Sequence, residues 1–145
     1  MARVTPITIK RELYADFRSD FGDNPVSQDL ARKTNEEAVK ESLRNLILTG
    51  KGERPFQPTL GGDIRNLLFE NATPASIVTV KEMLREMINN YEPRVSLIGI
   101  DLTSTVDGVG INGRLDNNSI DIAITFNVIN SDEAITLVQT ISRVR

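Results

Sequence analysis

Any catalysis by this chain would have to use carboxylates, lysine, tyrosine or serine, because the sequence contains no cysteine and no histidine. Without cysteine there is no thiolate nucleophile, no disulfide and no sulfur-ligated metal. Without histidine there is no Ser-His-Asp triad, no imidazole base and no histidine-ligated zinc or iron. Tryptophan is absent as well. These absences argue against most classes of soluble enzyme, and the sequence predicts no cofactor and no metal site.

Two opposite charges flank a proline in the triplet Glu92-Pro93-Arg94. The proline stiffens this corner, so both charges could dock on a partner at a small entropic cost. Arg94 could then grip a carboxylate or several carbonyl groups with its fixed fork of donors. Spacing alone favours the alternatives, an intramolecular salt bridge or a plain helix end.

A second stiff turn, Arg54-Pro55-Phe56, allows two interpretations. It could tuck Phe56 into the core, or it could present Arg54 and Phe56 to a partner. Nearby, Gly61-Gly62 precede an expected helix, where an anion could bind. No Walker-type Gly-Lys-Ser/Thr pattern accompanies them, so they predict a tight turn instead.

The elements before Pro93 are predicted to be helical. Apolar residues recur at helical spacing over 34–50, after a cap at Thr34 or Asn35, and again over 73–93. A connector rich in Gly and Pro follows the first of these helices over 49–63, and a short helix is expected over 64–69. Pro93 ends the last helix because it cannot continue helical geometry.

Beyond Pro93 the pattern changes to that of strands. Residues 95–105, 120–128 and 134–144 are rich in β-branched residues or alternate in polarity, and a bulge is expected near Leu97-Ile98. The sequence therefore predicts an α+β fold, a single domain with N-terminal helices packed on a small antiparallel C-terminal sheet.

Residues 1–33 are predicted to form an N-terminal arm or lead-in, with residues 34–145 as the domain. Tyr14, Phe17 and Phe21 are the expected anchors of this arm. They could pack on the chain's own core or dock on a neighbouring protein, and the sequence favours neither.

The last strand, Ala134 to Arg145, is a candidate sheet edge because it ends the sequence. An edge strand exposes backbone donors and acceptors that another chain's strand can pair with. The alternative is an edge blunted against aggregation, with Arg143 and Arg145 as protective charges.

Charge and hydropathy exclude two classes of partner. The net charge is −3 and the isoelectric point is near 5.0, which is opposite to the basic footprint of a nucleic-acid binder. No apolar run approaches the roughly 18 residues that a membrane span needs. The N-terminal residues lack a secretory layout, so we expect a chain made in the cytoplasm.

Four segments carry a resemblance to a known family, and it is strongest from Glu37 to Val95. They are Lys51-Gly-Glu-Arg-Pro-Phe56, Gly62-Asp63, Leu67-Leu-Phe-Glu-Asn71 and Asn90-Tyr-Glu-Pro-Arg-Val95. In this order and spacing they resemble the baseplate wedge and sheath-initiator family of contractile phage tails. That family has counterparts in the type VI secretion baseplate and in a small bacterial anti-adapter protein.

The resemblance implies a structural role. Family members sit in the wedges around the central tube, hold neighbouring wedge proteins and present a sheet edge on which the first sheath ring assembles. It favours partner contacts for the family's Glu-Pro-Arg hallmark and for the earlier turn, namely Glu92, Pro93, Arg94, Arg54 and Phe56. It also favours strand docking by Ile135, Leu137, Val138, Gln139, Ile141 and Arg143.

The implied partners are other baseplate wedge proteins and the tail sheath protein, with tail tube or hub proteins as further candidates. The implied location is the virion tail baseplate, assembled in the host cytoplasm. Three alternatives stay open: a type VI secretion baseplate subunit, a regulatory anti-adapter-like protein, and a lysozyme, a label this family has carried. Glycoside hydrolysis needs a carboxyl of raised pKa, whereas Glu53 and Glu92 each have an arginine close by in sequence and Glu70 lies in no acid/base motif.

Overall fold

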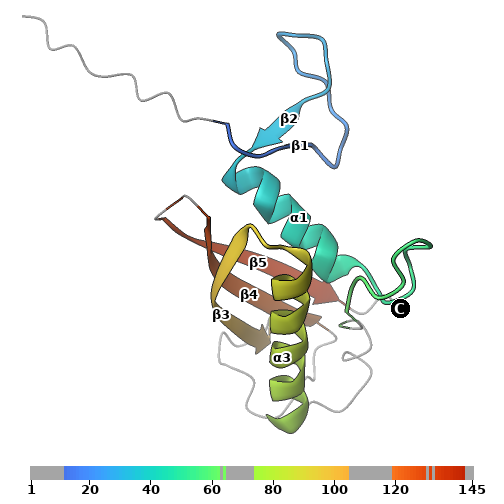
Figure 1. Cartoon of the computed structure of the whole chain (residues 1–145), viewed down its shortest axis with the longest axis vertical. Helices are drawn as coiled ribbons and strands as arrows, with labels where there is room; N and C mark the ends of the chain where they lie inside the picture. The colour runs from blue at the N-terminus through green and yellow to red at the C-terminus, as the bar shows by residue number, and fades with distance from the viewer. Residues whose placement is uncertain are drawn as a thin grey trace, which may run out of the picture. The chain divides into compact units, whose positions relative to one another are not determined.

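The computed structural model describes residues 12–62, 64, 74–104, 119–129, 131 and 133–142. Within them the chain has two helices, a two-stranded sheet and a three-stranded sheet, which confirms the predicted α+β class (Figure 1). Packing divides the chain into two compact units, Met1–Ala38 and Val39–Arg145. The division into an arm of residues 1–33 and a domain of residues 34–145 stays a prediction.

The first unit contains a β-hairpin. Strands β1 (Ala15–Phe17) and β2 (Arg32–Thr34) pair antiparallel, with Asp16 opposite Lys33. Asn35, expected as a helix cap, adopts a left-handed backbone conformation with φ 49°. Its side-chain oxygen accepts the backbone N–H groups of the residues that enter β1, Leu13 at 2.8 Å and Tyr14 at 3.4 Å.

Helix α1 (Glu36–Leu48) and helix α3 (Pro74–Tyr91) confirm the two longer predicted helices. Acidic residues occupy the first turn of α1, where the helix dipole favours them. Helix α3 ends directly before Glu92-Pro93, as proline geometry requires. The short helix expected over 64–69 lies outside the described residues except for Ile64. Neither α1 nor α3, the helices of the described chain, has the length and apolar character of a membrane span.

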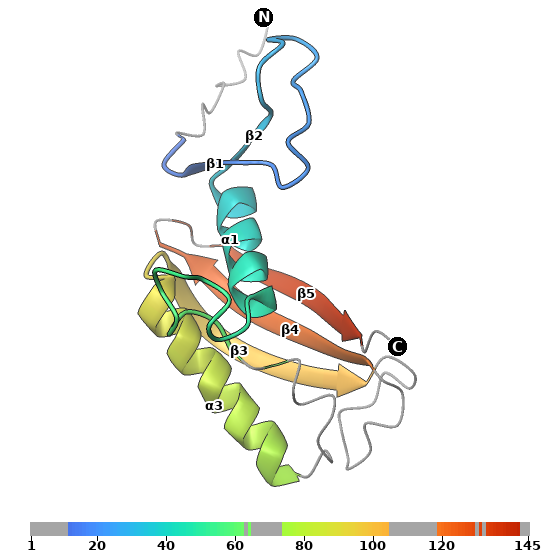
Figure 2. The ribbon, with the colours of Figure 1, turned by 90° about the vertical axis from the view of Figure 1, so that its right-hand side faces the viewer.

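Strands β3 (Val95–Ser104), β4 (Ser119–Val128) and β5 (Ala134–Ser142) form an antiparallel sheet with β4 in the centre (Figure 2). The register shifts between Leu97 and Gly99, so the predicted bulge is confirmed at Ile98. The last predicted strand is confirmed to Ser142, and residues 143–145, Arg143 among them, lie outside the described residues.

The core of the second unit lies between the helices and one face of this sheet. Helices α1 and α3 lie on the same side of the sheet (Figure 1), and alternate residues of β4 and β5 are buried. The large buried apolar side chains of the helices and sheet are Val39, Leu43, Leu46, Ile47, Val80, Leu84, Met87, Ile88, Val95, Ile100, Leu102, Ile120, Ile122, Ile124, Phe126, Val128, Ile135, Leu137 and Ile141.

Phe126 is fully buried in β4, and its removal tests this core. Phe126→Ala should lower the free energy of unfolding by about 3–5 kcal/mol, because it removes a large apolar side chain and leaves a cavity. Val78→Ala on α3 is the control, since Val78 is 60% exposed, and it should change stability by less than about 0.5 kcal/mol. Urea unfolding followed by circular dichroism measures both values. Equal losses in the two variants would contradict the assigned core.

Candidate partner-binding surfaces

The corner at residues 92–94 is built around a buried carboxylate. Glu92 is only 3% exposed. Arg94 donates to both of its oxygens, from Nε to Oε1 at 2.5 Å and from Nη2 to Oε2 at 2.7 Å, a two-point pairing. Ser42 of α1 donates its hydroxyl to Oε2 at 2.6 Å. The intramolecular salt bridge, one of the alternatives for this triplet, is therefore present in the structure.

Backbone hydrogen bonds fix the same corner. The N–H of Glu92 reaches the carbonyl of Ile88 at 2.8 Å, and the N–H of Val95 reaches the carbonyl of Glu92 at 3.2 Å. The carbonyl of Arg94 accepts the N–H of Ile129 at 2.9 Å, which ties the corner to the end of β4. Pro93 is exposed and about a third of the Arg94 side chain reaches the surface. The corner is rigid, and its outward groups are Pro93 and part of Arg94.

The charge state of Glu92 follows from its surroundings. Burial acts to raise the pKa of Glu92, but the hydrogen bonds from Arg94 and Ser42 outweigh it, so the pKa is lowered from its usual value of 4.5. Glu92 is therefore ionised at neutral pH. A general acid of a glycosidase needs the opposite shift.

The segment that follows α1, residues 49–62, forms a closed loop. Its two ends meet where the N–H of Gly62 reaches the carbonyl of Thr49 at 3.1 Å. The N–H of Gly52 donates to the carbonyl oxygen of Pro58 across the loop, at 2.9 Å. Gly61 has φ 103°, and a Cβ there would lie 2.3 Å from the Thr49 carbonyl oxygen. The predicted tight turn is confirmed, and this position requires glycine.

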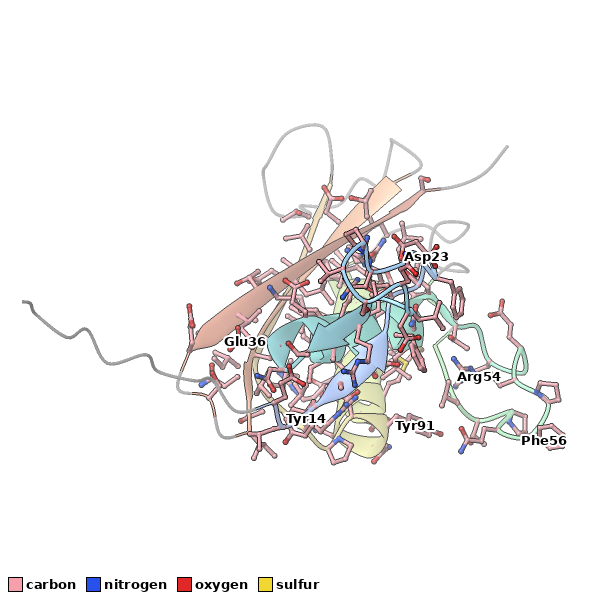
Figure 3. The ribbon with its side chains drawn as sticks, turned by 90° about the horizontal axis from the view of Figure 1, so that it is seen from above. Tyr14, Asp23, Glu36, Arg54, Phe56 and Tyr91 are labelled. Atoms are coloured by element: carbon pink, nitrogen blue, oxygen red, sulfur yellow. The ribbon has the colours of Figure 1, made fainter. Side chains whose placement is uncertain are left out.

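The far end of this loop carries an exposed aromatic side chain. Phe56 is 98% exposed, and Arg54 beside it is also exposed. In Figure 3 Phe56 lies at the outer end of the loop and points away from α1 and α3, and Arg54 lies on the same loop. The interpretation that Phe56 packs into the core is therefore wrong. The hydrogen bonds of residues 49–62 hold the loop closed and leave the aromatic ring outside it.

Strand β5 lies at a margin of the sheet. It pairs with β4 on one side, and no other strand of the described residues pairs with it. Ile135, Leu137 and Ile141 point into the core, whereas Val138 is 57% exposed and Gln139 is half-buried. Of the six residues predicted for docking, three thus have core side chains, and Arg143 lies outside the described residues. A docking strand would meet the backbone of β5 and the side chains of its open face.

The two margins of the sheet differ in how they are protected. Strand β3 has the bulge at Ile98, and its Asp101 pairs with Lys81 of α3 at 3.7 Å. Strand β5 contains no charged residue and no proline between Ala134 and Ser142. Bulges, charges and prolines are the usual means of preventing strand addition. The β5 margin has none of these over its described length.

Two further glutamates were considered for catalysis, Glu53 and Glu70. Glu53 is exposed on the loop and accepts the N–H of Gly50 at 2.9 Å, and Glu70 lies outside the described part of the chain. Within the described ranges, no group of three or more carboxylates is placed to hold a metal ion.

Comparison with known proteins assigns the chain to a family. The family model described as "Baseplate wedge protein gp25" matches residues 33–133. The chain belongs to this baseplate wedge family. The corner and the 49–62 loop both lie inside the matched segment, whereas most of the hairpin and all of β5 lie outside it.

Individual relatives agree with the family assignment. The baseplate wedge protein gp25 of Enterobacteria phage T4 is 33% identical over 96 residues, which cover 66% of this chain and 72% of that protein. A subunit in the cryo-EM baseplate of the anti-feeding prophage has a TM-score of 0.64 at 22% identity, covering 83% of this chain and 89% of its own. A putative tail lysozyme from Geobacter sulfurreducens has a TM-score of 0.62 at 21% identity, covering 76% and 92%. These two structures share the fold.

Sequence reasoning missed Ser42. Counted from Val39, Ser42 occupies an i+3 position of the apolar stripe of α1, next to Leu43. A small polar residue within an apolar stripe signals a buried polar partner from elsewhere in the fold. Here that partner is Glu92, 50 positions later.

Replacing the buried carboxylate tests the corner. Glu92→Gln should lower the free energy of unfolding at pH 7 by about 1–3 kcal/mol, because it weakens the three charge-assisted hydrogen bonds from Arg94 and Ser42. The folded-state pKa lies below the unfolded value, so the stabilisation is present above pH 4.5 and is lost as pH falls through the folded pKa. The gap between wild type and variant should therefore shrink at acid pH.

The matched control is Glu82→Gln, which breaks an exposed pair with Arg85 on α3. It should change stability by less than about 0.5 kcal/mol. Urea unfolding between pH 7 and pH 3 measures all three proteins. A constant gap across this range would contradict the role of the Glu92 charge.

Proposed function

We propose that this chain is a structural, non-enzymatic subunit of a contractile-tail baseplate that joins neighbouring wedge proteins and starts sheath assembly by strand pairing. Membership of the wedge family supports a baseplate role. The observation that carries the strand-pairing step is the uncharged, proline-free margin of β5. In this proposal the partners are other wedge proteins and the tail sheath protein, and the chain is assembled into the tail in the host cytoplasm.

Two surfaces of the second unit would hold the wedge partners. The corner presents Pro93 and part of Arg94 on a fixed backbone, and the loop presents Arg54 and Phe56. A preorganised surface loses little entropy on docking, and buried aromatic and arginine side chains dominate the affinity of most interfaces. In this arrangement Glu92 acts indirectly, because it orients Arg94 from inside the fold.

A main-chain joint suits the sheath contact. Strand addition takes its affinity from backbone hydrogen bonds, and an antiparallel sheet can extend at an open margin. The side chains of Ile135, Leu137 and Ile141 anchor β5 to the core, so the strand that receives its neighbour is itself firmly held.

The lowered pKa of Glu92 supports a role without catalysis. Of the two described glutamates considered for hydrolysis, Glu53 is exposed and Glu92 is buried, and the partners of Glu92 favour its charged form. The lysozyme description of the Geobacter protein belongs to that protein.

Phe56 offers the cleanest test of the wedge contact. Its side chain is 98% exposed, so Phe56→Ala should leave the fold intact and weaken binding to wedge partners by about 10- to 100-fold. Val78→Ala, which truncates another exposed apolar side chain, is the control. Arg94→Ala is less clean because it would leave Glu92 buried without its cation. Co-purification of wedge proteins with each variant is the measurement, and normal wedge assembly by Phe56→Ala would refute this contact.

Val138→Lys tests the β5 margin. A lysine on the open face of an edge strand opposes strand addition, while the 57% exposure of Val138 leaves the monomer folded. Sheathed tails should fall on the order of tenfold while baseplates still form. Val138→Thr, which keeps a β-branched residue, should behave as wild type, and electron microscopy counts the particles. Normal sheathed tails from Val138→Lys would contradict the docking strand. Deletion of residues 134–142 is unsuitable because it also removes three core side chains.

A further inference from the structure

The hairpin of the first unit exposes apolar side chains that its own strands do not cover. None of the described residues 12–35 is buried. The exposed fractions of the five large apolar residues are 48% for Leu13, 53% for Phe17, 67% for Phe21, 92% for Val26 and 38% for Leu30. A two-stranded ribbon has no core and is marginally stable alone in water. Exposed apolar side chains gathered on such an element indicate a binding surface.

The tip of this hairpin, residues 19–30, has a backbone held by hydrogen bonds. Asn24 organises it, because its N–H reaches the carbonyl of Asp29 at 2.7 Å and its carbonyl accepts the N–H of Gln28 at 2.9 Å. The side-chain oxygen of Asn24 also accepts the N–H of Val26 at 2.9 Å. Val26 therefore projects from a turn whose backbone is already fixed, which lowers the entropic cost of docking.

Backbone strain marks the same segment. Phe21 and Gln28 have φ values of 48° and 56°, in the left-handed region that side-chain-bearing residues seldom adopt. Such conformations cost free energy and cluster at functional segments. Phe21 is 67% exposed, so its aromatic ring does not contribute to a hydrophobic core.

The charge of the tip limits which partner fits. Residues 19–30 contain three aspartates, Asp20, Asp23 and Asp29, and no lysine or arginine. Arg18 neutralises Asp20 at 2.6 Å, so the tip keeps a negative balance around Phe21 and Val26. In a symmetric pair of identical chains the same patch would meet itself, and two acidic tips would repel.

We propose that the tip formed by Phe21, Asp23, Val26 and Asp29 inserts into an apolar pocket bordered by lysine or arginine on a different protein of the baseplate. The apolar side chains supply the buried area, and the aspartates select a basic border. This contact uses other residues than the corner, the 49–62 loop and the β5 margin.

Photo-crosslinking in assembled baseplates tests the proposal. A photoreactive amino acid replaces Val26 in the full chain, and Val78, exposed on α3, takes it as the control. Mass spectrometry of assembled particles should find the Val26 crosslink on another baseplate protein, in an apolar segment next to lysine or arginine. Crosslinks within the same chain, to a second copy of it, or at equal yield from Val78 to the same segment would each overturn the proposal.

Substitutions give a second measurement. Phe21→Asn removes the aromatic ring but keeps a residue that tolerates the left-handed conformation, so the hairpin should hold its shape. Combined with Val26→Ser, it should lower incorporation of the chain into baseplates by on the order of tenfold, with Val78→Ser as control. Asp23→Asn should weaken incorporation less and reduce its salt dependence. Unchanged incorporation of the double variant would contradict the proposal, whatever the outcome for Phe56→Ala and Val138→Lys.

Discussion

The second unit depends on keeping one carboxylate out of water. An ionised carboxylate that loses its hydration costs several kcal/mol unless charged and polar partners replace the lost water. Arg94 and Ser42 replace it at Glu92, and each comes from a different part of the chain. The helix pair and the start of the sheet are thereby held at one point. The guanidinium of Arg94 reaches the surface, and the buried carboxylate of Glu92 orients it.

The 49–62 loop and the β5 margin share one feature with the corner: a fixed backbone carries the exposed groups. In the loop, hydrogen bonds and the left-handed Gly61 fix the backbone, and Phe56 is then displayed outside it. In β5, alternate residues are buried in the core, and no other strand of the described chain pairs with its outer backbone. Each surface combines a rigid base with an exposed group. A surface that is already fixed in the free protein loses little conformational entropy when a partner binds.

Local patterns predicted the regular elements well and the long-range contacts poorly. Alternation from Ile120 to Val128 identified β4, and Pro93 located the end of α3, because both signals lie within a few residues of what they determine. The partnership of Ser42 with Glu92 joins positions 50 apart, and the local pattern around Ser42 does not identify its partner.

The loop and the hairpin show the same limit. The exposure of Phe56 depends on a contact between Thr49 and Gly62 that closes the loop from its two ends. Pairing in the hairpin depends on the Asn35 side chain and on left-handed residues, which sequence periodicity does not report.

The antiparallel ladder also has a mechanical consequence. Strand β4 pairs with β3 from Val95 onward and with β5 from Ala134 to Ser142, so hydrogen bonding is continuous from the Glu-Pro-Arg corner to the outer margin. A pull along the axis of β5 would load these bonds in shear, all together, instead of opening them one after another. If a contracting sheath were attached to β5, the hydrogen bonds of all three strands would resist its pull together.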